Sequence, residues 1–319
     1  MTGANVKRYA IAFSFDENIL VAAQVAIHSL LVTAPENVRY DIVLTYAKHT
    51  LSEASLAKIV TQIESAGHTC HLIDVGDAFK ECFEIRGITV PTYYRLLLPE
   101  LLPSVDQIIY SDVDIIFRQS PHSAADLLTE DDWLAGVKNV YRNKDVKYLQ
   151  ELGLESGKYI NAGFIVMNLS KMREHSLQSR FIEMSRTDYT YQDQDILNIT
   201  CAGHIRYLPE RYNIHAMHDY SEGAGKLTPD LDEELKQAVV LHYAGVKPWN
   251  SNACFYYDQW WEAYRQSPAY DFDFYFKHQR ESMARQQRQA HIAGGQWAKM
   301  QHMTKAQRLR SILKPFFWS

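Results

Sequence analysis

Residues 9–34 read "YAIAFSFDENILVAAQVAIHSLLVTA", in which a short apolar run passes directly into a longer segment with helical spacing. The first seven residues, "YAIAFSF", predict a β-strand. The segment that follows predicts an α-helix, because its apolar residues recur three and four positions apart; these are Ile19, Leu20, Ala23, Ile27, Leu30 and Leu31. A strand that leads straight into a helix is typical of α/β proteins.

The same alternation continues along the chain. "YDIVLTY" (40–46) predicts a second strand, and "SEASLAKIVTQIESAG" (52–67) predicts a helix that ends at Gly67, since glycine is favoured just past a helix C-terminus. "TCHLIDV" (69–75) predicts a third strand. Alternating strands and helices indicate a doubly wound parallel sheet with helices on both faces. Ligands of such sheets lie beyond the carboxyl ends of the strands.

Composition favours a globular protein with a substantial core, since 46% of the 319 residues are hydrophobic and 22% are charged. The four cysteines form no C-x-x-C pair, which argues against a zinc knuckle or a disulfide framework. The N-terminus resembles no leader peptide, and no window has the apolar length of a spanning helix. We therefore expect a cytoplasmic protein, either soluble or peripheral on a membrane.

Charge is unevenly distributed along the chain. Residues 277–319 carry nine Lys and Arg and one Glu, whereas the whole chain has a net charge of −5, so residues 1–276 are strongly acidic. An acidic body is a poor surface for nucleic acid, because phosphate contacts dominate that affinity. We predict a domain over 1–276 and a basic, aromatic-rich tail over 277–319. The tail could lie on an anionic membrane or be a simple extension.

Two carboxylates stand in the apolar segment "QIIYSDVDIIFRQ" (107–119), which predicts a fourth strand. Asp112 and Asp114 are two residues apart, so in a strand their side chains point to the same face. Two oxygens on one face, near a strand end, suit a hard divalent cation. The alternative is a surface turn with two solvated acids.

A histidine and a lysine follow an apolar strand in "HYAGVKPW" (242–249). His242 could supply a nitrogen ligand to a metal, Gly245 could let the backbone approach a diphosphate, and Lys247 could neutralise it. A histidine that caps the core and a solvated lysine are the alternative. The sequence has no Gly-rich phosphate loop, so a bound diphosphate would need metal and lysine instead.

Three further segments carry polar residues of interest. "YQDQDILN" (191–198) begins a predicted helix with Asp193 and Gln194, where Asp193 could contact a substrate or serve as the N-cap. "YINAGFIVMNL" (159–169) predicts a strand with a glycine, which often marks the close approach of a ligand. "TYYRLLLPELLP" (92–103) places Arg95 in an otherwise apolar helix, where it could contact a ligand or form a structural ion pair.

Together these segments resemble the family 8 retaining glycosyltransferases, a group with the GT-A fold that includes bacterial lipopolysaccharide galactosyl- and glucosyltransferases. The resemblance covers roughly residues 9–250 and rests on six motifs in the family's order: "FSFDEN", "TYYRLLLPELLP", "YSDVDIIF", "YINAGFIVMNL", "YQDQDILN" and "HYAGVKPW". It implies the GT-A nucleotide-diphospho-sugar transferase fold, a Rossmann-like mixed sheet flanked by helices.

The resemblance also implies roles for individual residues. Asp112, Asp114 and His242 would bind Mn²⁺, or Mg²⁺ in its place, and Gly245 and Lys247 would contact the diphosphate. The uridine and ribose would lie at Ser14, Asp16 and Asn18. The donor sugar and its anomeric carbon would lie among Arg95, Asn161, Ala162, Asp193 and Gln194. Asn139 stands where many family members have a sugar-contacting aspartate, so galactose and glucose both remain candidate donors.

The implied reaction transfers a hexose from a UDP-sugar to a saccharide acceptor, with retention at the anomeric carbon. Asp193 and Gln194 are the candidate catalytic residues, either through a carboxylate nucleophile or beside a front-face attack. Residues 141–159 are the candidate lid over the acceptor side. Lipid-linked saccharides are candidate acceptors, with the tail on the inner face of the cell membrane. Two alternatives are a non-catalytic UDP-sugar- or glycan-binding protein and a metal-dependent phosphohydrolase or nucleotidyltransferase.

Overall fold

The computed structural model describes residues 6–82, 90–139, 143–215, 234–252, 254 and 256–284. The chain forms two compact units, Met1–Ala269 and Tyr270–Ser319. In the second unit, residues 272–284 form a helix. The predicted tail begins at 277, and its part from residue 285 onward lies outside the described residues.

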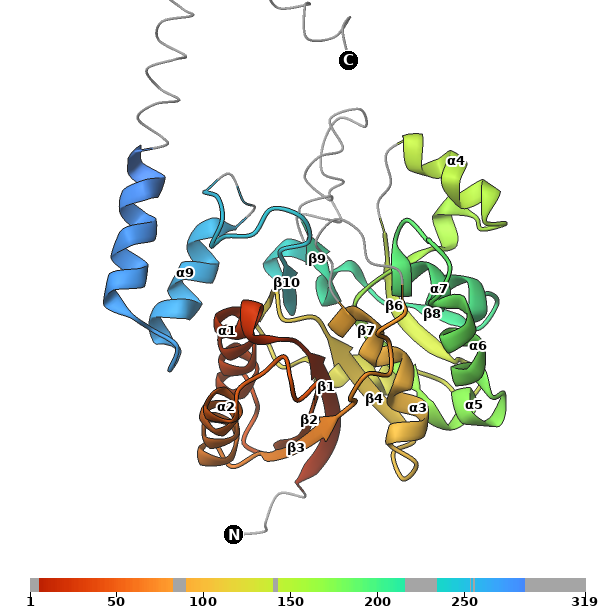
Figure 1. Ribbon diagram of the computed structural model, residues 1–319, viewed down its shortest axis with the longest axis horizontal. Coiled ribbons are helices and arrows are strands. Elements are labelled where there is room, and N and C mark those ends of the chain that lie inside the picture. The colour runs from red at the N-terminus through yellow and green to blue at the C-terminus, as the bar shows by residue number, and fades with distance from the viewer. Residues whose placement is uncertain are drawn as a thin grey trace, which may run out of the picture. The chain divides into compact units, whose positions relative to one another are not determined.

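A seven-stranded sheet forms the centre of the first unit (Figure 1). Its strand order is β3-β2-β1-β4-β7-β6-β8. The strands are β1 (Lys7–Ser14), β2 (Val38–Tyr46), β3 (Thr69–Asp74), β4 (Gln107–Ser111), β6 (Leu134–Lys138), β7 (Ile160–Asn168) and β8 (Ile205–Tyr207). β1 to β4 are parallel to one another, as the alternation of strands and helices predicts, but β7 is antiparallel to both β4 and β6. β6 is antiparallel to β7 and parallel to β8, so β7 is the one strand of these seven that runs against the other six. The expected mixed sheet is confirmed, and the all-parallel pattern is wrong for β7.

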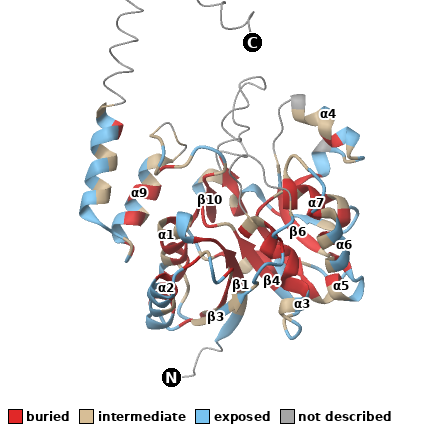
Figure 2. Cartoon of the chain, in the orientation of Figure 1, coloured by how far each residue is buried: buried red, intermediate tan, exposed pale blue. Residues whose placement is uncertain are grey.

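Helices cover both faces of this sheet, because each strand alternates its side chains between them. Ile11 and Phe13 of β1 pack in one core with α1 (Leu20–Val32) and α2 (Glu53–Ser65), whereas Ala12 packs in the core on the other face. That second core includes α3 (Leu98–Leu101), α5 (Leu169–Glu174), α6 (Leu177–Met184), α7 (Gln192–Thr200) and the 3₁₀ segment η2 (Val90–Leu97). Figure 2 shows the buried residues concentrated between these layers.

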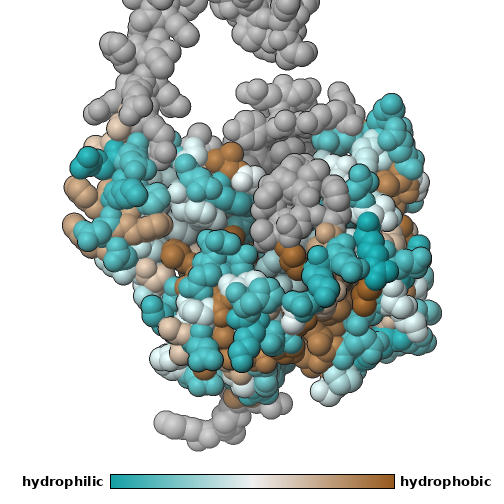
Figure 3. Space-filling model, viewed as in Figure 1, coloured by the Kyte–Doolittle hydropathy of each residue, from teal (hydrophilic) through white to brown (hydrophobic). Residues whose placement is uncertain are grey.

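The predicted C-terminal end of α2 is confirmed. Ser52 caps its N-terminus by accepting a hydrogen bond from the Ser55 amide, and Gly67 beyond its C-terminus has φ +80°, a conformation that favours glycine. The surface over α2 is largely hydrophilic (Figure 3), while Ile59 and Ile63 face the core. The remaining elements are α4 (Asn143–Glu151), α9 (Tyr257–Gln266), η1 (Glu17–Ile19), η3 (Pro121–Leu127), η4 (Ser156–Lys158) and η5 (Glu210–Tyr212).

A second, three-stranded sheet joins the middle of the chain to its later part. Its order is β5-β10-β9, with β5 at Ile115–Phe117, β10 at Val240–His242 and β9 at Ile214–His215. β10 is antiparallel to β5 and parallel to β9. The pairing of Ile115 with His242 brings the end of β10 against the segment that joins β4 to β5. This small sheet therefore unites residues more than a hundred positions apart in sequence.

Candidate active site

A cavity of about 600 Å³ lies at the carboxyl ends of the central parallel strands, where α/β sheets bind their ligands. Its walls come from the end of β1, the β4–β5 connection, the start of β7, the first turn of α7 and the segment after β10. The predicted site residues that line it are Ser14, Asp16, Arg95, Asp112, Asp114, Asn139, Asn161, Ala162, Asp193, Gln194, His242, Gly245 and Lys247. Asn18 is exposed and does not line this cavity.

Asp112 and Asp114 lie in a bend and not in a strand. β4 ends at Ser111, so the expectation that strand alternation places both carboxylates on one face was wrong. The side chains converge for another reason. The Asp112 amide donates to the Gly163 carbonyl on β7 (2.8 Å), and the Tyr243 amide donates to the Asp114 carbonyl (2.8 Å). The two sheets thus hold opposite ends of the bend.

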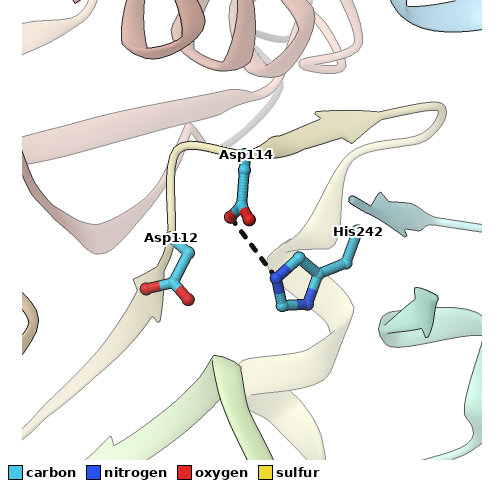
Figure 4. A group of neighbouring side chains, drawn as sticks. All are labelled: Asp112, Asp114 and His242. Carbon is cyan, nitrogen blue, oxygen red and sulfur yellow. Dashed lines mark ion pairs between the residues drawn. The ribbon is translucent and has the colours of Figure 1, made fainter. Parts of the chain in front are cut away.

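Asp112, Asp114 and His242 form one cluster, in which one ligand atom of each lies within 4.8 Å of the others (Figure 4). Oδ1 of Asp114 lies 3.3 Å from Nε2 of His242, and the other Asp114 oxygen contacts the Lys247 ammonium. Burial would raise the pKa of Asp114, but Lys247 and His242 hold it well below its usual range. Asp114 is therefore ionised at neutral pH.

Arg95 joins the metal-site candidate to the first turn of α7. Its side chain is only 2% exposed, with Nη2 2.6 Å from Oδ1 of Asp112 and Nε 3.1 Å from Oδ2 of Asp193. The guanidinium also lies over the Tyr110 ring, 4.0 Å from its centroid. Burial disfavours its charge, yet the two carboxylates raise the pKa of Arg95 above its ordinary value. The structural ion pair that the sequence suggested is present, and it forms part of the cavity wall.

Asp193 does not cap α7. The N-cap position belongs to Tyr191, and Oδ1 of Asp193 accepts a hydrogen bond from the Thr92 hydroxyl (2.7 Å). Its side chain is almost fully buried, and this burial raises the pKa of Asp193 to about 6, against the opposing effect of Arg95. The N-cap alternative for Asp193 was therefore wrong.

The raised pKa of Asp193 predicts a pH-dependent stability. Between the ordinary pKa of an aspartate and about pH 6, the folded protein binds more protons than the unfolded chain, so its free energy of unfolding falls as the pH rises. Asp193→Asn removes the ionisable carboxyl group and with it the free-energy cost of burying a carboxylate above about pH 6. We expect the variant to be more stable than the wild type by on the order of 2–3 kcal/mol at about pH 7.5, with the difference disappearing towards about pH 4. Urea unfolding at both pH values measures this, and lower stability of the variant at about pH 7.5 would contradict it.

Gln194 is held in place by β7 and by a tyrosine. Its Oε1 accepts from the Ala162 amide (3.0 Å), and its Nε2 donates to the Tyr159 hydroxyl (3.2 Å). Tyr159 in turn donates to Asp195, which also accepts from Tyr148 of α4 (2.6 Å).

The candidate lid segment begins with residues 141–142, which lie outside the described residues, and its role stays a prediction.

At the end of β1, Ser14 and Asp16 face the cavity while Asn18 turns to solvent. The Ser14 hydroxyl shares a hydrogen bond with that of Thr45 (2.6 Å). Asp16 accepts from the Asn18 backbone amide (3.0 Å), which caps η1. Asn18, the third residue predicted to contact uridine and ribose, therefore takes part through its backbone amide, which holds the Asp16 carboxylate.

The loop after β10 places a lysine over the acidic cluster. Gly245 has φ +96°, in the left-handed region, so the turn itself requires glycine. Lys247 donates to the Tyr243 carbonyl (2.9 Å) and contacts Asp114. Lys247 thus neutralises a carboxylate of the cluster, and its contact with a diphosphate stays a prediction.

Sequence reasoning missed Thr92, Asn213 and His215. Asn213 is fully buried and is hydrogen-bonded to Asn161 and to His242, which both line the cavity. His215 lines the cavity itself, with its ring centroid 6.1 Å from that of His242. Thr92 opens the segment "TYYRLLLPELLP", whereas Asn213 and His215 lie at the end of "HIRYLPERYN" and just beyond it, in a segment without clear periodicity. Their only sequence signal was the gathering of polar side chains before a strand.

The cavity has the charge and the donor atoms of a cation site. Among the described residues that line it, four are carboxylic acids, Asp16, Asp112, Asp114 and Asp193, and two are permanently charged cations, Arg95 and Lys247. One divalent ion would balance this excess. Carboxylate oxygens with an imidazole nitrogen are donors that Mn²⁺ accepts readily, and the residues present therefore fit such an ion.

The known proteins that this chain resembles are glycosyltransferases. The model of the family "Glycosyl transferase family 8" matches residues 10–253. Lipopolysaccharide 1,3-galactosyltransferase of Salmonella typhimurium is 28% identical over 263 residues, which span 78% of this chain and 75% of that protein. Lipopolysaccharide 1,2-glucosyltransferase of Escherichia coli is 26% identical over 255 residues, which span 76% and 73%.

Solved structures point the same way. The crystal structure of the galactosyltransferase LgtC in complex with donor and acceptor sugar analogs superposes with a TM-score of 0.70 at 26% identity. The match covers 83% of this chain and 98% of that chain. In the part of this chain that the structure describes, no helix is long and apolar enough to cross a membrane.

Proposed function

The chain belongs to glycosyl transferase family 8 and is a glycosyltransferase, and on this basis we propose that it is a retaining hexosyltransferase. It moves galactose or glucose from a UDP-sugar to a saccharide acceptor in the synthesis of lipopolysaccharide or a surface polysaccharide. The observation that carries this proposal is a cavity at the carboxyl ends of the parallel strands, which unites Asp112, Asp114 and His242 with Lys247.

The donor is proposed to extend across the cavity from β1 to α7. Ser14 and Asp16 would contact the uridine and ribose, and Gly245 and Lys247 the diphosphate. The hexose would lie against residues from η2, β7 and α7, namely Arg95, Asn139, Asn161, Ala162, Asp193 and Gln194, all of which line the cavity. Arg95, Ala162 and Asp193 of this wall are buried, which supports the proposal, because limited access of water protects an activated sugar from hydrolysis.

Asp112, Asp114 and His242 would hold Mn²⁺, with Mg²⁺ as the alternative. When bound, the ion supplies Lewis-acid stabilisation of the charge that develops on the departing diphosphate. Lys247 would stabilise the same charge from the loop after β10. Arg95 would keep Asp112 and Asp193 at a constant separation, because its guanidinium contacts both.

Retention at the anomeric carbon permits a carboxylate nucleophile or a front-face attack. Oδ1 of Asp193 accepts from Thr92, and Oδ2 faces Nε of Arg95 at 3.1 Å. These contacts lower the nucleophilicity of the carboxylate and favour an electrostatic role, in which Asp193 stabilises positive charge at the anomeric carbon during front-face attack. Gln194 would then position the sugar without forming a covalent bond to it.

The decisive experiment measures release of UDP from a panel of UDP-sugars in the presence of Mn²⁺, with and without saccharide acceptors. Acceptor-dependent release of UDP from UDP-galactose or UDP-glucose is the expected result, with loss of activity in EDTA. Undiminished transfer in EDTA would contradict the metal assignment. Tight binding of UDP with Mn²⁺ but no turnover with any acceptor would instead support a UDP-sugar- or glycan-binding protein of the same fold.

The basic tail is proposed to hold the enzyme on the inner face of the cell membrane, near a lipid-linked acceptor. Lys and Arg beside Trp297, Phe316, Phe317 and Trp318 form a composition suited to an anionic lipid surface. We expect deletion of residues 297–319 to abolish sedimentation with anionic vesicles and to leave turnover of soluble acceptors unchanged. Neutral vesicles are the control, and continued sedimentation of the truncated protein with anionic vesicles would contradict the proposal.

A further inference from the structure

The two nitrogens of His242 face different environments. Nε2 faces Asp114, and Nδ1 faces Asn213. In a neutral imidazole only one nitrogen carries a proton, and the group that contacts the other nitrogen decides which one can bind a cation. A proton on Nε2 would point at the cluster and block its use as a ligand. The arrangement around Nδ1 therefore matters to the proposed metal site.

A backbone amide determines the orientation of the side chains behind His242. The Gly163 N–H donates to Asn161 at 2.9 Å, and because a backbone N–H can only donate, the Asn161 atom that receives it must be the oxygen. The same oxygen lies 2.8 Å from the Asn213 side chain, which must present its NH₂ group there. Asn213 consequently presents its oxygen to Nδ1 of His242, at 2.9 Å. An oxygen acceptor at that position requires a proton on Nδ1.

The opposite orientation of Asn213 is excluded by the same contacts. It would set the Asn213 oxygen against the Asn161 oxygen at 2.8 Å, with no proton between them. Water cannot relieve such a contact, because Asn213 is fully buried and a separation of 2.8 Å leaves no room for a water between the two oxygens. The Asn161 side chain cannot simply rotate, since the Gly163 amide would lose its acceptor.

We infer that Asn213 is a positioning residue: oriented by Asn161 and the Gly163 amide, it holds His242 in the Nδ1-protonated tautomer with Nε2 directed at Asp112 and Asp114. The inference rests on the proposed cation site. It extends the site to two amide side chains that touch no ion themselves. Partners of this kind are worth about 10- to 100-fold in metal affinity in proteins that use histidine ligands.

The first test is titration of the nucleotide-free protein with Mn²⁺, followed by the electron paramagnetic resonance signal of the free ion. Asn213→Leu keeps the approximate volume and removes both hydrogen bonds, and we expect a loss of Mn²⁺ affinity of about 10- to 100-fold. The matched control is Asn198→Leu. Asn198 is also buried and makes two hydrogen bonds to the main chain of Ile160, but it contacts no member of the cluster. Equal affinity losses in both variants would overturn the inference.

A pair of substitutions at Asn161 separates orientation from packing. Asn161→Asp keeps an oxygen acceptor for both Gly163 and Asn213 and should retain wild-type or tighter Mn²⁺ binding. Asn161→Leu removes that acceptor and should weaken binding about as much as Asn213→Leu. Wild-type affinity in Asn161→Leu would contradict the orienting role of Asn161.

The second test observes the tautomer directly and needs no metal. In protein labelled with [¹⁵N]histidine, the side-chain nitrogens of His242, assigned by loss of their signals in His242→Gln, should show the proton on Nδ1. Without the ion, Nε2 can also carry a proton toward the Asp114 carboxylate 3.3 Å away, so the deciding observation is at Nδ1. An Nδ1 without a proton in the wild type overturns the inference even if Asn213→Leu fails to fold. Failure of the wild type to bind Mn²⁺ would count against the proposed function, and the tautomer would still be decided by these spectra.

Discussion

Asp114→Asn is expected to reduce sugar transfer by about a thousandfold or more. Asp114 is the buried carboxylate of the cluster, with His242 at one oxygen and Lys247 at the other. The substitution removes the negative charge that balances the Lys247 ammonium and that would attract the proposed cation. Loss of a cation's charge stabilisation is worth several kcal/mol, and each ~1.4 kcal/mol changes the rate tenfold.

The measurement is kcat/KM for UDP release with saturating acceptor, together with Mn²⁺ affinity. Asp132→Asn is the matched control, since Asp132 is also poorly exposed and pairs with Arg206 at 2.9 Å, but it lies outside the cavity. We expect the control to keep near wild-type activity. If the rate of Asp114→Asn stayed within a few fold of the wild type, the assignment of Asp114 to the cation site would be wrong. Asp112→Asn should also inactivate the enzyme, since it removes a second ligand.

Gly163→Ala is expected to lower both Mn²⁺ affinity and transfer by about a hundredfold. A Cβ atom at this position would lie 2.2 Å from Cε1 and 2.8 Å from Nδ1 of the His242 ring, so the ring must move. A displacement of about 1 Å in a catalytic constellation can cost about a hundredfold in rate. Overpacking of this kind also costs about 1–3 kcal/mol in the free energy of unfolding.

Gly157→Ala is the control for Gly163→Ala. Gly157 is exposed, and no atom lies within 4 Å of its added Cβ, so this variant should match the wild type in stability and rate. Thermal unfolding separates the two effects at Gly163, because a purely structural fault would lower stability without changing Mn²⁺ affinity in the folded fraction. Wild-type Mn²⁺ affinity in Gly163→Ala would show that the ring tolerates the methyl group.

Much of the fold could be predicted from local pattern. The strand over 9–15, the helix after it and the helix that ends at Gly67 are all present, because period and end signals act over a few residues. The GT-A glycosyltransferase fold, predicted from the six motifs, is confirmed. The prediction of an all-parallel sheet was wrong for β7. The direction of that strand depends on the path of the chain between β4 and β7 and not on the composition of β7.

For the site, the sequence supplied the residue types, and the tertiary structure supplied the reasons for their positions. Gly163 illustrates the difference. Its place in a strand suggested the close approach of a ligand, but the atoms that approach it belong to His242. Arg95 offered a choice between an ion pair and a ligand contact, and the structure places its ion pairs within the cavity wall.

By itself the sequence determined the α/β class, the family and the residues proposed to carry the chemistry, because these depend on local periodicity and on motifs within short segments. Only the tertiary structure decided how Asp112, Asp114 and His242 meet, and which tautomer His242 adopts. These features arise from pairing between β5 and β10 and from hydrogen bonds among Gly163, Asn161, Asn213 and His242. Contacts between residues so far apart in the chain leave no periodic signal in any one segment.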